Sequence, residues 1–203
     1  MIDLFVSQYL GLKAYLRTGG VIMAPLMLVS LVMWLLIVER ALFFRRLHHK
    51  NINLATAVAH IADNHMPDLT QYRDAVSLLV ARFLACRSND RQLDRFILDE
   101  IVLTINRSLD DYLAVIGVLA AVAPLMGLLG TVIGMIDTFD VLALFGTGNV
   151  KGMAGGISEA LITTQTGLLV AIFGLYMKGF LDRRARNLKQ RVAQAGYHLR
   201  RTI

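Results

Sequence analysis

The chain has 203 residues, of which 56% are hydrophobic, with a mean hydropathy of +0.56 and a net charge of +6. So apolar a composition exceeds what the surface of a soluble globular domain tolerates, and it indicates a membrane protein. Most of the excess positive charge follows the last apolar segment, without the basic and aromatic pattern of nucleic-acid binding, so no nucleic-acid partner is expected. A single cysteine, Cys86, excludes an internal disulfide framework.

Residues 1–20 are expected to form an amphipathic helix at the periplasmic membrane interface. Their apolar side chains recur at roughly helical spacing. A cleavable signal would begin with basic residues, whereas this segment has none at its start and contains Asp3. Gly19 and Gly20 are expected to end the helix, because glycine disfavours helical backbone.

Residues 21–40 form the first predicted transmembrane helix. The stretch from Val21 to Val38 is uncharged, and Pro25 is tolerated because it lies in the first turn. More basic residues follow this span than precede it. The positive-inside rule therefore predicts a periplasmic N-terminus and a cytoplasmic location from residue 41 onward.

Residues 41–111 are mixed in charge and are predicted to form a helical cytoplasmic region, with a break near Pro67. A cluster at residues 88–90 offers an N-cap for a later helix. Isoleucine or leucine then recurs every four residues, at Leu93, Ile97, Ile101 and Ile105. Because no helix breaker follows, we expect one helix of about 50 residues, about 75 Å long, that enters the membrane from the cytoplasm.

Residues 112–140 contain the second predicted transmembrane helix, uncharged from Tyr112 to Ile136. Small and hydroxyl-bearing residues recur along it in steps of three and four, a pattern typical of close helix packing: Gly127, Gly130, Thr131, Gly134 and Thr138. Pro124 frees a backbone carbonyl one turn earlier and is expected to kink the helix. The kink is either a static bend or a hinge.

Asp137 and Asp140 lie at the outer end of this span, before a short periplasmic loop at residues 141–152. Acids at a membrane interface are usually just solvated, and we favour that interpretation. The alternative is that the two carboxylates gather cations at a channel mouth.

Residues 153–178 form the third predicted transmembrane helix, in which Glu159 is the only charged side chain before Lys178. A charge at the centre of a span costs about 2.5 to 3.5 kcal/mol on insertion scales, so a lone acid is expected in a polar path. Mostly small or hydroxyl-bearing residues lie within about half a turn of its face: Gly152, Gly155, Gly156, Thr163, Thr166 and Val170. Glu159 is therefore a candidate for an ion pathway, or alternatively a hydrogen-bonding group between helices.

Residues 179–203 are a basic cytoplasmic tail, expected to fix orientation and to contact anionic lipids, with partner binding as the alternative. The sequence thus predicts an all-α membrane protein with three transmembrane helices, two of them extended into the cytoplasm, and a helical cytoplasmic part. It contains no Walker, G-x-S-x-G or HExxH motif, so no enzyme and no cofactor is expected. His60, His65 and Cys86 lack convincing ligand spacing, so no metal site is expected.

Two segments closely resemble the paired signature of the MotA/TolQ/ExbB proton-channel family, most like its three-span members. They are AVAPLMGLLGTVIGMIDTF, residues 121–139, and GGISEALITTQTGLLVAI, residues 155–172. The resemblance implies a subunit of a bacterial inner-membrane motor. It also implies a pentamer around a single-span partner of the ExbD/TolR type that carries an intramembrane Asp, and a further protein of the TonB or TolA type.

The resemblance also implies roles for three residues. Glu159 matches the essential acid of the family, Thr131 the threonine of its GTV segment, and Thr164 the threonine that follows the acid. On an ideal helix Thr164 points about 140° from Glu159, so it is expected to serve a neighbouring interface. Many members have a proline where this chain has Phe173 before Gly174, so no kink is expected there.

These observations predict a motor in which Glu159 alternates between protonated and ionised states. The expected role is Ton-type energisation of outer-membrane transport, and the alternative is a Tol-type envelope motor. A passive oligomeric scaffold is a rival from another class. Protons are the expected coupling ion, with sodium as the alternative, because the hydroxyls of Thr131, Thr163 and Thr166 suit either ion.

Overall fold

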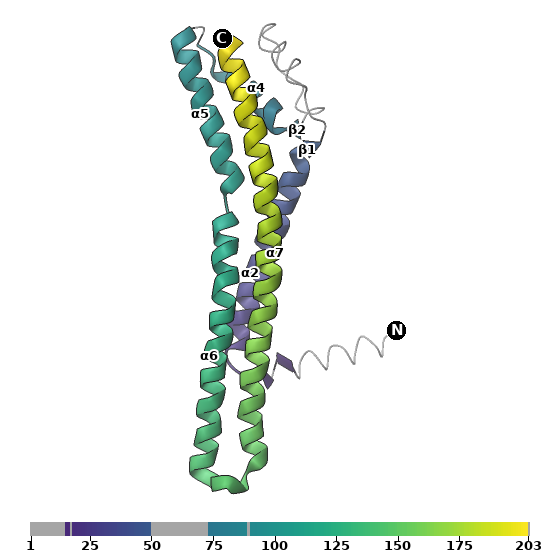
Figure 1. The fold of residues 1–203 in the computed structure, drawn as a ribbon, viewed down its shortest axis with the longest axis vertical. Helices are drawn as coiled ribbons and strands as arrows, with labels where there is room; N and C mark the ends of the chain where they lie inside the picture. The colour runs from purple at the N-terminus through teal and green to yellow at the C-terminus, as the bar shows by residue number, and fades with distance from the viewer. Residues whose placement is uncertain (1–14, 17, 50–72, 89, 203) are drawn as a thin grey trace, which may run out of the picture. The chain divides into compact units, whose positions relative to one another are not determined.

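The computed structural model describes residues 15–16, 18–49, 73–88 and 90–202 (Figure 1). The predictions for most of the N-terminal amphipathic helix, for the break at Pro67 and for His60 and His65 lie outside these residues. The chain divides into two compact units. Unit 1 comprises Met1–Ile37 and Val115–Lys178, and unit 2 comprises Val38–Ala114 and Gly179–Ile203.

The described part of the chain is almost entirely helical, which confirms the all-α fold class. Its helices are α2 (Met23–Arg46), α4 (Ala75–Cys86), α5 (Arg91–Asp110), α6 (Leu113–Phe145) and α7 (Val150–Thr202), with a 3-10 turn, η1 (Gly146–Gly148), between the last two. Three stretches, within Met23–Arg46, Arg91–Gly148 and Val150–Arg201, are long and apolar enough to cross a membrane. The expected third span and basic tail form one helix, since α7 continues through both.

A two-residue antiparallel ladder interrupts the helical pattern in the region predicted to be purely helical. Strand β1 (His48–His49) pairs with β2 (Arg73–Asp74), with His48 opposite Asp74. The ladder brings the end of α2 next to the start of α4. Asp74 then begins α4 with a capping box, since its side chain accepts the Ser77 N–H and its own N–H donates to Ser77 Oγ at 3.0 Å. The Asp74 carboxylate also accepts the Ala75 N–H at 2.8 Å.

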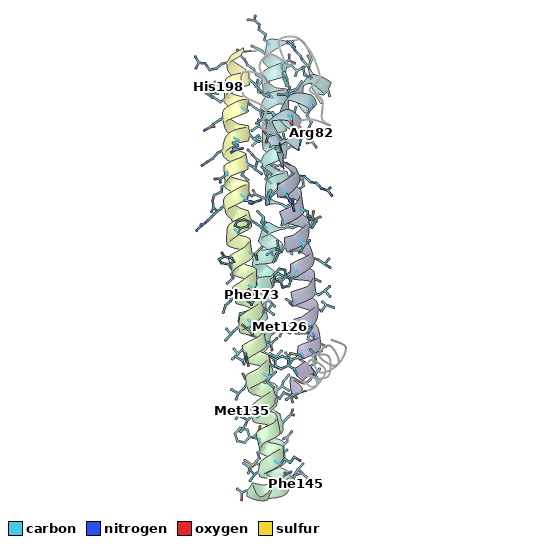
Figure 2. All side chains as sticks on the ribbon, turned by 90° about the vertical axis from the view of Figure 1, so that its right-hand side faces the viewer. Arg82, Met126, Met135, Phe145, Phe173 and His198 are labelled. Carbon is cyan, nitrogen blue, oxygen red and sulfur yellow. The ribbon has the colours of Figure 1, made fainter. Side chains whose placement is uncertain are left out.

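In unit 1, α6 and α7 run antiparallel and lie side by side, joined by η1 (Figure 1). Gly146 ends α6 with a φ of +62°, a left-handed conformation that glycine adopts without steric cost. Asn149 Oδ1 accepts the Gly152 N–H at 3.0 Å and so satisfies one of the free donors at the start of α7. Figure 2 shows Phe145 at this end of the pair.

The apolar part of α2 packs against this pair. Met23 and Leu26 are buried in one cluster with Ala123 of α6 and Ala171 of α7. Further along, Gly174 of α7 lies between Met33 and Ala120: a Cβ there would lie 2.5 Å from the Met33 sulfur and 2.9 Å from the Ala120 Cβ. Glycine at this position therefore lets three helices meet.

In unit 2, α4 and α5 pack together and are joined by charged contacts around a buried carboxylate. Asp94, only 2% exposed, accepts the Ser88 N–H at 2.8 Å and lies 3.5 Å from Arg87 Nε. The buried face of α5 differs from the expected series of apolar residues at every fourth position. Leu93 is exposed, and the buried apolar residues are Leu98, Ile101, Ile105 and Leu109. The shift arises because the buried line follows the three- and four-residue steps of a helix rather than steps of four alone.

The expected single helix of about 50 residues is wrong, because α5 ends at Asp110 and α6 begins at Leu113. Between them Tyr112 has a φ of +62°, which is unusual for a residue with a side chain. The buried Arg40 of α2, 3% exposed, holds this break. Its guanidinium donates to Ser108 O at 3.1 Å, lies 3.7 Å from the Asp111 carboxylate and sits 4.8 Å above the Tyr112 ring.

Arg40 stabilises the end of α5. The carbonyls of the last turn of a helix have no partner within the helix, and the Arg40 guanidinium supplies one while adding a favourable positive charge. Pro124, by contrast, lies inside α6, which is continuous from Leu113 to Phe145. An arginine on another helix therefore stabilises the interruption in this part of the chain, and the roles of Pro124 as a bend or hinge stay predictions.

Candidate functional site

Helices α6 and α7 approach each other along a seam of small residues. A Cβ on Gly134 would lie 2.6 Å from Gly156 O, and a Cβ on Gly127 would lie 3.0 Å from Thr163 O. Cβ atoms essentially never approach other atoms more closely than 3.0 Å, so at Gly134 any side chain would push the two backbones apart. The structure thus places Gly127, Gly134 and Gly156 at close helix contacts, as the pattern of small residues indicates.

The seam continues at further positions. Gly130 faces the Thr163 side chain, and Gly156 faces Thr138, whose hydroxyl donates to Gly134 O at 2.8 Å. Gly155 differs, because it is exposed and a Cβ there would meet no described atom within 4 Å. Its role in close packing stays a prediction that concerns a neighbouring molecule rather than this chain.

Two threonines fill the seam on the α7 side. Thr163 is fully buried, and its hydroxyl donates to Ala160 O at 2.9 Å and to Glu159 O at 3.1 Å. The Thr164 hydroxyl lies 3.2 Å from both Ala160 O and Gly127 O, so it reaches across to α6. The interface that Thr164 serves is therefore one within the chain itself.

Glu159 lies beside the seam, on a face of α7 that Tyr15 and Gly20 approach. It is half-buried, and its carboxylate occupies the position that a Cβ on Gly20 would take. Thr166, about two turns further along the same face, forms a hydrogen bond of 2.8 Å with the Tyr15 hydroxyl. The structure therefore brings Glu159 and Thr166 together on one face, where Gly20 contacts Glu159 and Tyr15 contacts Thr166.

The other predicted site residues lie elsewhere. The Thr131 hydroxyl donates within α6 to Leu128 O at 2.6 Å. Asp137 and Asp140 are exposed near the end of α6. Within the described ranges, no group of three or more His, Cys, Asp or Glu side chains that could hold a metal ion occurs.

Four residues make contacts in this region that the sequence pattern did not predict: Tyr15, Gly20, Gly167 and Gly174. Gly167 was visible in principle, because it continues the three- and four-residue steps from Gly156, and a Cβ there would lie 2.6 Å from Ala123 O. Gly20 gave a weaker signal, because a Gly-Gly pair before an apolar run indicates only a helix end. Its contact with Glu159 depends on tertiary structure.

Comparison with known proteins identifies the family of this chain. Residues 70–194 match the model of the MotA/TolQ/ExbB proton channel family. The chain is 34% identical to the protein named ExbB-like 1 of Synechocystis sp., over 85% of this chain and 71% of the relative. It is 33% identical to the biopolymer transport protein ExbB of Aquifex aeolicus, over 55% of this chain and 72% of the relative. It is 30% identical to the biopolymer transport protein ExbB of Salmonella typhimurium, over 74% of this chain and 67% of the relative. The chain therefore belongs to the MotA/TolQ/ExbB proton channel family, and its relatives indicate the ExbB type.

Proposed function

We propose that this chain is the proton-channel subunit of a bacterial inner-membrane motor that energises outer-membrane transport in a Ton-type system. Membership of the family supports a channel subunit rather than an enzyme, and the relatives named biopolymer transport protein ExbB support the Ton type. The observation that carries the proposal is Glu159, the only charged side chain between Lys151 and Lys178 of α7. Intramembrane acids of this kind usually belong to ion paths.

In the proposed mechanism Glu159 gains and loses a proton during each step. A charge that crosses the membrane field gains about 2.3 kcal/mol per 100 mV, which is enough to bias a conformational step of ordinary size. Ionisation of the carboxylate attracts a hydrogen-bonding group of the partner, and protonation removes that attraction. The partner is a single-span helix of the ExbD/TolR type that carries an intramembrane Asp, inside a pentamer of this chain, and its movement acts on a TonB-like protein.

The proposed orientation places the N-terminus in the periplasm and the C-terminus in the cytoplasm, because the basic residues follow the apolar part of α7. A cavity of about 160 Å³ lies in this basic part, lined by Phe44, Arg184, Asn187, Leu188 and Arg191. Guanidinium groups bind phosphate in bidentate fashion. This cavity supports the proposed contact with anionic lipids.

The test is Glu159→Gln in the full chain, produced together with its partner subunits in cells that lack the native copy. Uptake of a substrate that needs an energised outer-membrane transporter should fall to background, since Gln cannot exchange a proton. The matched control is Glu100→Gln, the same substitution at an exposed position of α5, which should leave uptake unchanged. Normal uptake by the Glu159→Gln variant would contradict the proposal.

The same variant separates the proposal from its rivals. If uptake persists while resistance to detergents and large antibiotics is lost, the Tol-type role is correct. A passive scaffold instead predicts that Glu159→Gln is harmless and that only seam substitutions such as Gly134→Leu disrupt the oligomer. Measurement of uptake while the proton and sodium gradients are collapsed one at a time decides between protons and sodium.

A further inference from the structure

The start of the chain makes a specific contact with the intramembrane acid. Residues 19–22 form a turn, here called the Gly20 turn, and Gly20 has a φ of +63°. An added Cβ on Gly20 would overlap the Glu159 carboxylate, and its nearest atoms would be Oε1, the carboxyl carbon and Oε2 of that side chain. The backbone of residue 20 is therefore in van der Waals contact with the acid.

A hydrogen bond fixes the residues before the turn. The Thr166 hydroxyl donates to Ile162 O at 2.7 Å, so its one proton is already used. The 2.8 Å contact with Tyr15 is therefore donated by the Tyr15 hydroxyl to Thr166 Oγ1. Thr166 shares a helix face with Glu159, so this bond fastens the start of the chain next to the acid.

The turn is also anchored on its other side. Gly19 N–H donates to Tyr15 O at 3.1 Å, and Met23 N–H donates to Gly20 O at 3.3 Å, which connects the turn to helical backbone before and after it. Met23 is buried in the cluster that includes Ala123 and Ala171, and Tyr15 and Leu16 pack against that cluster. The position of Gly20 is thus determined by α2, α6 and α7 together.

Given the proposed function, on which this inference rests, we propose that the Gly20 turn is a positioning element for the Glu159 carboxylate. The turn covers one side of the acid and limits the conformations of its side chain, so proton exchange takes place from the opposite side. Gly20 is the key residue, because any larger side chain would occupy the space of the carboxylate. Tyr15 acts indirectly, by holding the turn through Thr166.

The chain provides a matched control for substitution of Gly20. Gly20→Ala introduces two changes: a side chain at a positive φ and an overlap with Glu159. Gly146 has nearly the same φ, +62°, but no described atom lies within 4 Å of an added Cβ. Gly146→Ala therefore reproduces the backbone strain without the overlap, and the difference between the two variants isolates the contact with the acid.

The first measurement does not depend on motor activity. A lipid-soluble carbodiimide reacts with protonated carboxyl groups, and mass spectrometry of the full chain in membranes measures the rate at which Glu159 is labelled. Because overpacking must displace either the turn or the carboxylate, we expect labelling in Gly20→Ala to be faster by about tenfold. Gly146→Ala should be labelled at the unmodified rate. Equal or slower labelling in Gly20→Ala would overturn the proposal.

A second variant tests whether the effect acts through the carboxylate. Glu159→Asp shortens the side chain by a methylene group and draws the carboxylate back toward α7, so the overlap with an added Cβ on residue 20 becomes smaller. In that background Gly20→Ala should change the labelling rate at residue 159 much less than it does beside Glu159. If Gly20→Ala accelerates labelling equally in both backgrounds, the turn acts by general loosening of the structure and the proposal fails.

Transport then links the turn to the motor. Gly20→Ala should reduce uptake by about tenfold or more, since misplacement of a reacting group by about 1 Å can cost about 100-fold in rate. Gly146→Ala should reduce it little. If Glu159→Gln leaves uptake intact, the proposed function fails whatever Gly20→Ala does to labelling. If Glu159→Gln abolishes uptake but Gly20→Ala does not reduce it, only the positioning role is refuted.

Discussion

Different kinds of side chain hold the helices together in the α6–α7 seam of unit 1 and in unit 2. In the seam, glycines bring two backbones together and threonine hydroxyls bond to carbonyls, with no described ion pair. In unit 2, α5 and the end of α7 bury large residues such as Leu98 and Leu199, and ion pairs surround them.

The difference follows from the solvent on each side. Lipid is as apolar as leucine, so burial of leucine between two membrane helices gains little, and close van der Waals contact must provide the attraction. In water, burial of apolar surface is itself favourable, and charged residues are easily solvated around it. In the proposed topology the first half of α7 lies in lipid and the second half in water, so substitutions in the two halves should behave differently.

The largest effect is expected from Gly134→Leu in the seam. A Cβ there would lie 2.6 Å from Gly156 O and 2.9 Å from Ala160 N, so backbone rather than a flexible side chain must move. We expect a loss of about 3 kcal/mol or more, seen as loss of the folded chain on heating in detergent.

Two glycines with open surroundings serve as comparisons for that variant. Gly148→Leu should have little effect, because no described atom lies within 4 Å of an added Cβ. Gly155→Leu should leave the fold of the single chain intact for the same reason. If Gly155→Leu lowers the amount of oligomer but not the stability of the single chain, then Gly155 packs against a neighbouring subunit.

Arg40→Leu should cause the next largest loss, about 2 to 4 kcal/mol. It leaves Ser108 O and the Asp111 carboxylate without the buried guanidinium and removes the contact with the Tyr112 ring. Hydrogen exchange of the amides from residue 108 to 113 should accelerate. Arg46→Leu, at an exposed position of the same helix, should change neither the melting temperature nor the exchange rates.

Thr164→Val tests the polar contacts of the seam. It keeps the shape of the side chain but removes the hydroxyl that lies 3.2 Å from Gly127 O. We expect a loss of about 1 kcal/mol in thermal unfolding. Thr164→Ser keeps the hydroxyl and should retain most of that stability, whereas equal losses in the two variants would assign the effect to packing.

The smallest effect is expected in unit 2, from Arg200→Ala. Arg200 lies 3.4 Å from Asp99, and both side chains are about half exposed, so water weakens their attraction. Removal should cost no more than about 0.5 kcal/mol, and the cost should vanish at high salt. A salt-independent loss larger than that of Thr164→Val would contradict the contrast between the two regions.

The sequence allows prediction of the features that follow a local pattern. The three apolar helices and the glycines of the seam are visible because uncharged length and three- and four-residue steps are properties of single segments. The break at Tyr112 could not be predicted in this way. Its neighbours include neither glycine nor proline, and the arginine that stabilises it is far away in the sequence.

The contact between Gly20 and Glu159 was unpredictable for the same reason. It joins positions far apart in the chain, and a Gly-Gly pair carries no information about what its backbone will approach. The placement of Thr163 and Thr164 was only partly predictable. An ideal helix gives their angles from Glu159, but it does not specify where α6 lies.

The threonine hydroxyls of unit 1 determine which ions or hydrogen-bonding groups can bind beside them. Those of Thr131, Thr163, Thr164 and Thr166 all direct their single proton to backbone carbonyls. What each can still offer is oxygen lone pairs, which suit a hydronium ion, a bare cation or the O–H of a neutral carboxylic acid. An ionised Glu159 therefore gains no hydrogen-bond donor from these four hydroxyls.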